Sequence, residues 1–430
     1  MIGLPKTRDD FLKAFSSYKA QSWLDIFESQ IQSYLNNSDF SSEKKEEWKY
    51  FPFQKVIKND FVFQKGYKDP QELKSQISDS FLIRVKNGKA FPAFQKNKNI
   101  SLFHWSDFLN GKVILEDSIK DKIIFALKRT KNNFCVLNNI FYPEGFILLI
   151  RDHLKKPLEI QYTHSSQIEN QGLNLRNFIF VEKKAQVIET FFSRKEKKDL
   201  FLNIQTDCFL EEKAKLEYCF LDQTGDRDVL IHHLFSTLSK ESKAYFFSLC
   251  LKARLSRWFK EVYHAEKSQS EIKGITLMNG NSHTDHKIIV NHQGKKGKSS
   301  QLYKSFLFDS AKHIFQGLVS IEKQAGESSA RQLNKNYLFG SKAFAVAFPE
   351  LDICPSDVKA EHGATVSPFS ENKDLIFYLE SRGIDPLLSV HLVLMSLLRE
   401  TLFGLQNSSK NLIQKLISQK ISSLENTFIK

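Results

Sequence analysis

The feature of this sequence that most constrains its fold is an alternation of apolar and polar residues that recurs along most of the chain. Leu202 and Ile204, for example, alternate with Asn203 and Gln205. Rows of this kind lie at 202–208, 214–220, 315–321 and 344–348. Successive side chains of a β-strand point to opposite faces, so a period of two residues predicts strands with one buried face. The chain is therefore predicted to be mainly β.

The length of the strand-rich part narrows the choice of architecture. It extends over residues 101–365 of the 430-residue chain, and its turns carry Gly, Asn, Asp and Lys. A strand-rich part of this length is too long for a simple β-sandwich. A β-solenoid accommodates it, because successive turns stack around one continuous core. The pattern favours the solenoid. Because no exact repeat is visible, two separate all-β domains remain an alternative.

Helical spacing replaces the alternation at both ends of the chain. Residues 1–100 open with Phe11, Phe15 and Tyr18 at helical spacing and are predicted to form a helical or mixed domain. In the C-terminal domain, 366–430, one apolar helix face carries Leu387, Val390, His391, Leu394 and Leu398. A second amphipathic helix follows Ser409. The pattern leaves open whether this helix pair caps the solenoid or docks a partner.

The charge and the hydropathy pattern bear on location and partners. The formal net charge is +13, but the lysines are dispersed along the chain and several are diluted by neighbouring acidic residues. Nucleic-acid-binding modules gather such charge on one element, so no nucleic acid partner is expected. The longest near-apolar stretch, 387–398, is about half of the ~20 residues that span a bilayer, so no membrane helix is expected. The first ten residues lack a secretion signal, and a cytoplasmic location is predicted.

The cysteines and histidines do not form a recognisable metal site. The five cysteines are widely spaced without a C-x-x-C pair, and we expect mostly buried, reduced thiols. Among the histidines, His286 and His292 have the spacing to share one strand face, whereas His283 does not, and the role of this group stays open. His232 and His233 must point to opposite faces. The sequence contains no phosphate-binding loop, nucleophile elbow or H-E-x-x-H motif, so we predict that the chain is not an enzyme.

An ordered series of motifs in the C-terminal half carries a family resemblance. The segments, with the patterns to which the first three are similar, are Ser300-Gln301-Leu302-Tyr303-Lys304 (S-x-Q-x-x-K), Phe315-Gln316-Gly317 (F-x-G), Gln332–Leu338 (Q-x-N-x-x-L), Pro349–Ile353, Asp357-Val358-Lys359, His362–Thr365 and Phe377–Ile384. Nearer the start, Trp48–Pro52 is similar to a W-K-Y-x-P segment. Together these resemble the SufB/SufD family of iron–sulfur cluster assembly scaffold proteins. His362-Gly363 stands where SufB-like chains read H-E, which favours the SufD branch.

The resemblance implies a right-handed parallel β-helix with N-terminal and C-terminal helical caps. It also implies a non-catalytic subunit of a SufBCD complex. Such a subunit pairs with a SufB-like chain through β-helix edges and binds the SufC-like ATPase through its C-terminal helices, at Leu387, Val390, His391, Leu394 and Leu398. Isolated chains of this kind also allow a homodimer.

The resemblance further implies a metal-handling residue. His362 would lie at the SufB interface and hold iron or a nascent cluster transiently, while the isolated chain binds no cofactor stably. We add the inference that Glu361, if close, orients the imidazole ring or supplies an oxygen ligand.

Three alternatives remain at this stage. Within the family, a SufB-like chain would nucleate the cluster itself, and Cys354 is the cysteine placed for it near the end of the β zone. Outside the family, the chain would be a β-helical carbohydrate-active enzyme, which needs a pair of carboxylates that we cannot identify. The third alternative is a nucleic-acid-binding protein.

Overall fold

In the computed structural model, the chain is described over residues 2–3, 49–52, 61–63, 73–129, 132–140, 144–164, 170–192, 199–369 and 373–424. The helix expected around Phe11, Phe15 and Tyr18 lies outside these ranges.

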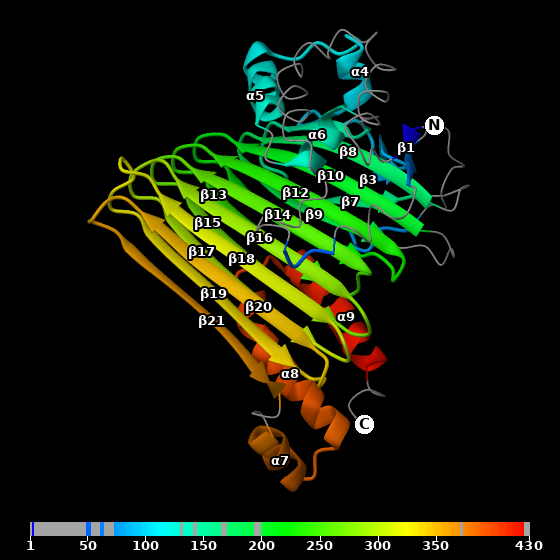
Figure 1. The fold of residues 1–430 in the computed structure, drawn as a ribbon. Coiled ribbons are helices and arrows are strands. Elements are labelled where there is room, and N and C mark those ends of the chain that lie inside the picture. The colour runs from blue at the N-terminus through cyan, green and yellow to red at the C-terminus, as the bar shows by residue number, and fades with distance from the viewer. Residues whose placement is uncertain are drawn as a thin grey trace.

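Most of the described chain forms two large sheets that face each other (Figure 1). The first sheet contains β1 (Ile2–Gly3), β2 (Val62–Phe63), β5 (Ile100–His104), β6 (Phe146–Ile150), β8 (Asn170–Val181), β10 (Asp199–Leu210), β12 (Asp228–Leu238), β14 (Leu255–His264), β16 (His283–His292), β18 (Lys312–Ile321) and β20 (Phe344–Ile353). The second sheet contains β3 (Phe81–Lys86), β4 (Lys89–Pro92), β7 (Leu158–Thr163), β9 (Lys184–Phe192), β11 (Lys215–Gln223), β13 (Lys243–Cys250), β15 (Gln269–Met278), β17 (Lys298–Leu307), β19 (Ser329–Leu338) and β21 (Lys359–Pro368).

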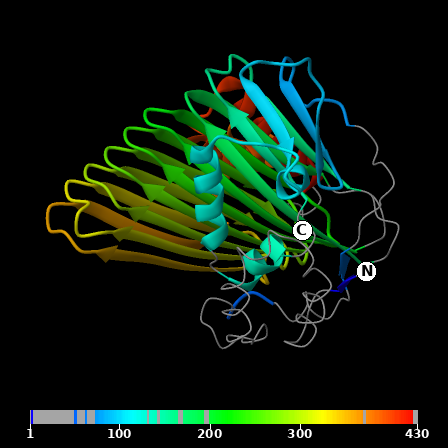
Figure 2. The same cartoon turned by 90° about the horizontal axis from the view of Figure 1, so that it is seen from above.

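The two sheets are the walls of a parallel β-solenoid of about seven turns. From β7 to β21 the chain alternates between the sheets, so that each turn adds one strand to each wall. Residues stacked on neighbouring turns are 28, 29 or 31 positions apart in the pairs Arg257–Asp285, Asn174–Asn203 and Ser305–Asn336. Seen from above, the turns follow one another as a regular stack (Figure 2). The prediction of a mainly β solenoid is confirmed.

The alternation in the sequence places one set of side chains between the walls. On β14, Trp258 and Val262 face the interior and belong to a continuous apolar core that extends from β3 to β18. Cys208 and Cys250 are fully buried in the same core, and Cys354 is the exposed member of the five thiols.

Five successive turns from the first sheet to the second, from the β10–β11 turn to the β18–β19 turn, share one backbone conformation. In each of these five a charged residue adopts a left-handed conformation with φ between 58° and 61°: Lys213, Glu241, Lys267, Lys296 and Glu327. Its N–H donates to a carbonyl of the following turn, as from Lys213 to Lys240 (3.0 Å) and from Lys267 to Lys295 (2.8 Å). A small buried residue comes next, such as Ser242 or Ser268. These charged–small pairs are a repeat that the sequence analysis did not detect.

The outer face of the first sheet is covered by α4 (Trp105–Leu109), α5 (Asp117–Lys128) and α6 (Asn133–Ile140). These helices lie within residues 101–365, where strands were expected. Ile119, Ile123, Ala126 and Leu127 have helical spacing and are buried against this sheet, which explains the difference. The outer face of the second sheet packs against α8 (Pro386–Leu402) and α9 (Asn407–Ser423), while α7 (Lys373–Ser381) contacts α8.

Two features fix the start and the middle of α8. Asp385 is its N-cap, and its carboxylate accepts hydrogen bonds from the backbone of Leu387 (2.9 Å) and Leu388 (3.3 Å). The Lys304 ammonium on β17 donates to the carbonyl of Leu397 (2.6 Å) and pairs with Glu400 (2.8 Å). Within the described ranges, no helix has the length and apolar character of a membrane span.

The buried ion pair between Arg257 on β14 and Asp285 on β16 allows a test of how strongly side-chain contacts stabilise the first sheet. Its Nη1 and Oδ2 are 2.7 Å apart, and both side chains are almost completely buried. Asp285→Ala leaves a buried guanidinium without this partner, so we expect a loss of about 3–5 kcal/mol in unfolding free energy. The solvent-exposed pair Lys240–Glu266 (3.3 Å) is the control, and Glu266→Ala is expected to have a much smaller effect on the unfolding free energy, because water screens exposed ion pairs. Denaturant titration measures both, and equal effects would contradict the prediction.

Candidate functional site at the open end of the solenoid

The solenoid ends on two strands that have a neighbour on one side only. β20 is the last strand of the first sheet and pairs with β18, and β21 is the last strand of the second sheet and pairs with β19. Both lie at the same end of the stack (Figure 1). Because no further turn covers them, residues of β21 that face the interior remain largely exposed. The interior of the solenoid therefore opens to the outside here.

The family-like motifs converge on this opening although they are far apart in sequence. Gln301 on β17, Gln332 on β19 and His362 on β21 are successive partners in the register of the second sheet. All three belong to the interior-facing set, since Ala330 and Ala360 of the same set pack in an interior apolar cluster. Gln332 Nε2 donates to Gln301 Oε1 at 3.2 Å. The two amides and the imidazole thus form one column that ends at the opening.

Gly317 on β18 makes room for this column from the opposite wall. A Cβ atom at Gly317 would lie 1.7 Å from Gln332 Nε2 and 2.9 Å from a ring carbon of Phe315. A side chain is therefore excluded here by the fully buried Gln332. The absence of a side chain at the Gly of the F-x-G motif thus leaves the space that the Gln of the Q-x-N motif occupies.

The structure separates His362 from Glu361. His362 is exposed at the opening, and its immediate neighbour in sequence points to the outer face of β21. There the Glu361 carboxylate pairs with Arg331, with Oε1 2.6 Å from Nε. The two side chains that we considered together are thus directed to opposite faces of one strand.

Behind the opening, the interior contains neutral histidines. His313 Nε2 lies 3.2 Å from His286 Nδ1, and His313 Nδ1 lies 2.9 Å from the side-chain oxygen of Asn336. Burial lowers the pKa of His313 to about 4 and that of His286 well below its usual value. Both imidazoles are therefore uncharged at neutral pH and act as hydrogen-bonding core residues.

The group His283, His286 and His292 divides as the spacing predicts. His286 and His292 are buried on the interior face, whereas His283 lies on the outer face next to Phe51. His292 stacks on His264, with ring centroids 4.6 Å apart, and lies 2.8 Å from the hydroxyl of Ser299. No cluster of three or more potential metal ligands from His, Cys, Asp and Glu is found among the described residues. The predicted opposition of His232 and His233 is also confirmed, because His232 stacks on Phe220 in the core and His233 lies beside Asn132 outside it.

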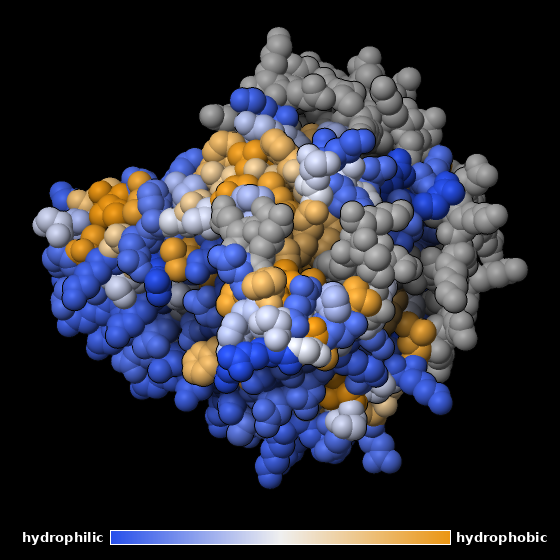
Figure 3. All heavy atoms as spheres, turned by 90° about the horizontal axis from the view of Figure 1, so that it is seen from below, coloured by the Kyte–Doolittle hydropathy of each residue, from blue (hydrophilic) through white to orange (hydrophobic). Residues whose placement is uncertain are grey.

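The helix residues predicted to contact a partner are largely occupied by the chain's own core. Leu394 and Leu398 are completely buried against the second sheet, Val390 packs on the same cluster, and Leu387 and His391 are half-buried. The amphipathic pattern identified a buried face correctly but could not show that the solenoid itself covers it. The exposed apolar side chains of α7 and α8 are instead Leu375, Phe377, Tyr378, Leu388 and Leu392. Seen from below, the face that carries these helices shows apolar side chains among polar ones (Figure 3).

Comparison with known proteins agrees with this geometry. A family model described as "SUF system FeS cluster assembly, SufBD core domain" matches residues 163–396, more than half of the chain. The iron–sulfur cluster assembly protein SufD of Escherichia coli is 25% identical over 406 residues, which cover 90% of each chain. SufD of Plasmodium berghei is 26% identical over 263 residues, and a SufBD family protein of Synechocystis is 29% identical over 253 residues. The matched parts span 20% and 55% of those two relatives and 60% and 56% of this chain.

The fit between Gly317 and Gln332 can be tested by substitution. Gly317→Ala forces the Gln332 amide out of its place and breaks its bond to Gln301, so we expect a loss of about 1–3 kcal/mol in unfolding free energy. Gly363→Ala on β21 is the control, because its Cβ would meet only Leu333 Cδ2 at 3.3 Å. In a Gln332→Ala background the cost of Gly317→Ala should fall to the part caused by the Phe315 ring, as a double-mutant cycle would measure. An unchanged cost in that background would contradict the fit.

Proposed function

Because the chain belongs to the SufB/SufD family, we propose that it is a non-catalytic scaffold subunit, of the SufD type, in a complex that assembles iron–sulfur clusters. The observation that carries the proposal is the open end of the solenoid, where two unpaired strand edges and the exposed imidazole of His362 lie together. The cargo of this subunit is iron or a nascent iron–sulfur cluster, which the subunit holds jointly with a partner and then releases.

The edges of β20 and β21 are the proposed contact with a SufB-type subunit. An unpaired edge presents a row of free N–H and C=O groups that a strand of another chain can extend. A partner that adds a strand to each sheet would continue both walls and close the opening. It would also cover the exposed apolar residues of these two strands, Phe344, Phe348, Ile353 and Val366.

The proposed metal site is shared between the two chains. A neutral imidazole supplies one lone pair to iron, and a thiolate from the partner would be its natural complement. The described residues place no cluster of further ligands around His362, so this chain alone would hold iron weakly. Weak binding by each half suits a site that must release its cluster.

The exposed apolar residues of α7 and α8 are the proposed docking surface for a SufC-type ATPase. Leu388 and Leu392 are 50% and 42% exposed on the helix whose buried face packs on the second sheet. Deletion of α8 would uncover that sheet, so point substitutions on the exposed face are the better test.

His362→Ala is the first test, in a complex reconstituted with SufB-type and SufC-type partners. We expect the complex to assemble normally while the rate of cluster formation falls about tenfold or more, because one metal ligand is lost. Glu361→Ala is the matched control, since this neighbouring side chain faces the opposite side and should leave the rate unchanged. Absorption of the cluster measures the rate. Full activity of His362→Ala, or an equal loss in Glu361→Ala, would contradict the role of His362.

The double substitution Leu388→Glu/Leu392→Glu tests the ATPase contact. Charges in the centre of an apolar contact should lower the affinity for the SufC-type protein at least tenfold, while pairing with the SufB-type chain is retained. Ile114→Glu changes an 89% exposed apolar residue elsewhere and serves as the control. Calorimetric titration measures both affinities, and an unchanged affinity in the double variant would assign these helices to capping alone.

A second candidate within the family is supported by Cys354. This exposed thiol follows β20 directly, at the same open end as His362. A SufB-like chain that nucleates the cluster itself would use such a cysteine. Anaerobic reconstitution of the isolated chain with iron and sulfide separates the candidates. A SufB-like chain gains a charge-transfer absorption that Cys354→Ser removes, whereas we expect no such absorption here.

A further inference from the structure

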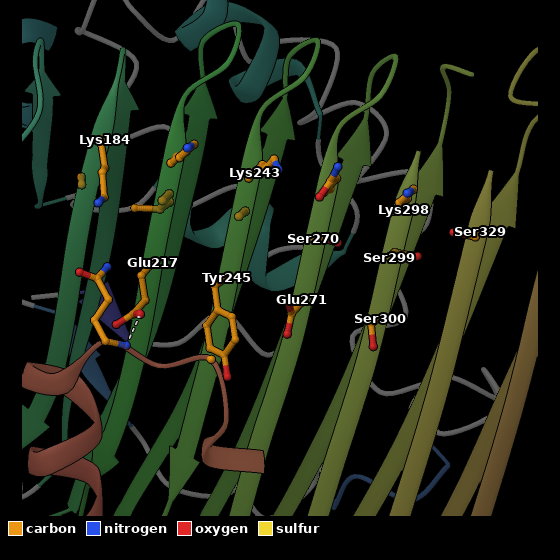
Figure 4. A pocket seen from close by; sticks show the side chains of 17 residues that line it. Lys184, Glu217, Lys243, Tyr245, Ser270, Glu271, Lys298, Ser299, Ser300 and Ser329 are labelled. Atoms are coloured by element: carbon orange, nitrogen blue, oxygen red, sulfur yellow. Dashed lines mark hydrogen bonds between the residues drawn. The ribbon is translucent and has the colours of Figure 1, made fainter. Parts of the chain in front are cut away.

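Four lysines lie in one register row on the outer face of the second sheet, which we call the lysine ladder: Lys184, Lys215, Lys243 and Lys298; a fifth lysine of the row, Lys359 on β21, is separated from Lys298 by Ser329. Each is the first residue of its strand. Lys184 is the register partner of Lys215, and Lys215 of Lys243. Gln269 separates Lys243 from Lys298 by one strand. Lys184, Lys243 and Lys298 can be followed across the strands in Figure 4.

The lysine ladder differs from the lysines of the adjacent turns. Four lysines of these turns each lie within reach of a carboxylate: Lys213 of Glu212 (3.4 Å), Lys240 of Glu266 (3.3 Å), Lys267 of Glu266 (3.6 Å) and Lys296 of Glu327 (3.4 Å). None of the four ladder lysines forms an ion pair with any residue of the described ranges, and all four are exposed. The charges of these four turn lysines are thus balanced within the chain, and the ladder charges are not.

This arrangement has an electrostatic cost that the fold does not require. Neighbouring strands are about 4.8 Å apart, so in-register lysines repel each other along the row. The first position of a strand in this row also takes uncharged polar residues, as the half-buried Gln269 and Ser329 show. Four like charges in register are therefore explained better by a negatively charged binding partner than by the solenoid itself.

The lysine ladder borders a groove of about 530 Å³ that has room for such a partner. The groove is bounded on its other side by Gly404 and Gln406, between α8 and α9. Its buried acidic residue, Glu217, accepts hydrogen bonds from the Gln406 backbone (2.8 Å) and from Gln186 (2.9 Å). Glu271 pairs with Lys273 (3.2 Å). The two carboxylates of the groove are thus engaged by other groups, and the ladder ammonium groups are left for an external anion.

We propose that the lysine ladder binds the acidic face of an α-helix from a partner protein. Acidic residues that recur once per helical turn are spaced 5.4 Å on average, close to the strand spacing of about 4.8 Å, and long side chains absorb the difference. Acidic residues on one face of an extended peptide recur at about 6.8 Å and fall out of step with the ladder after two strands. The ladder extends over four strand spacings, about 19 Å, which matches some 13 helical residues. The proposal is independent of the role of His362.

The experiment compares two variants with equal change in charge. The ladder variant is Lys184→Gln/Lys215→Gln/Lys243→Gln/Lys298→Gln, and the control is Lys213→Gln/Lys240→Gln/Lys267→Gln/Lys296→Gln in the turns. The probe is a fluorescent alanine-based helical peptide of about 20 residues with Glu once per turn on one face. A scrambled peptide of the same composition and a single-stranded DNA oligonucleotide of equal charge are compared with it by anisotropy at low salt.

We expect the full chain to bind the one-faced peptide, the ladder variant to bind it about tenfold more weakly, and the control variant to change by less than about twofold. The ladder variant should also be as stable to denaturant as the full chain or more so, because repulsion is removed. Equal weakening in the two variants would overturn the proposal. Equal binding of the scrambled peptide, or ladder-dependent binding of DNA tighter than that of the peptide, would likewise exclude an acidic helix as the occupant.

Discussion

The rest of the structure depends on in-register stacking of each turn on the one before it. Rings in equivalent positions on adjacent turns pack on each other, as Tyr162 on Phe191 (4.0 Å between centroids) and Phe180 on Phe209 (5.1 Å). A turn is stable because its neighbour buries its faces and satisfies its backbone. The last turn has no such neighbour, so its strand edges and its interior-facing side chains are exposed together. An opening at this end is a direct result of the architecture, and the proposed site occupies it.

Strand β17 connects the two surfaces that are proposed to meet partners. Gln301 points inward to the column that ends at His362, while Lys304, three residues later, points outward and holds α8 through Leu397 and Glu400. Both belong to the same S-x-Q-x-x-K motif. A displacement of α8 by a bound protein would therefore act on the strand that supports the opening, and one short motif serves both contacts.

The sequence was sufficient for the fold class because strand alternation is a local signal. It also placed His286 and His292 on one face, since that follows from spacing alone. It failed where tertiary packing decides the outcome. The face with Leu394 and Leu398 was recognised as apolar, but β15 and β17 of the second sheet, which pack on this helix, are formed by residues more than 80 positions away. The repeat of a charged residue followed by a small one was not recognised, because the solenoid turns that carry it are 26 to 32 residues long and vary in length. Glu361 was paired with His362 because they are adjacent in sequence, although strand geometry directs neighbours to opposite faces.

The order of the turns also has a consequence for synthesis of the chain. Nearly all stacking contacts join residues about one turn apart, so each turn can close onto the previous one soon after it leaves the ribosome. The growing end of the stack is then always the newest strand pair, and the edges of β20 and β21 are completed last. Exposed edges promote aggregation, and their late appearance would shorten the interval between their formation and their pairing with the proposed partner subunit.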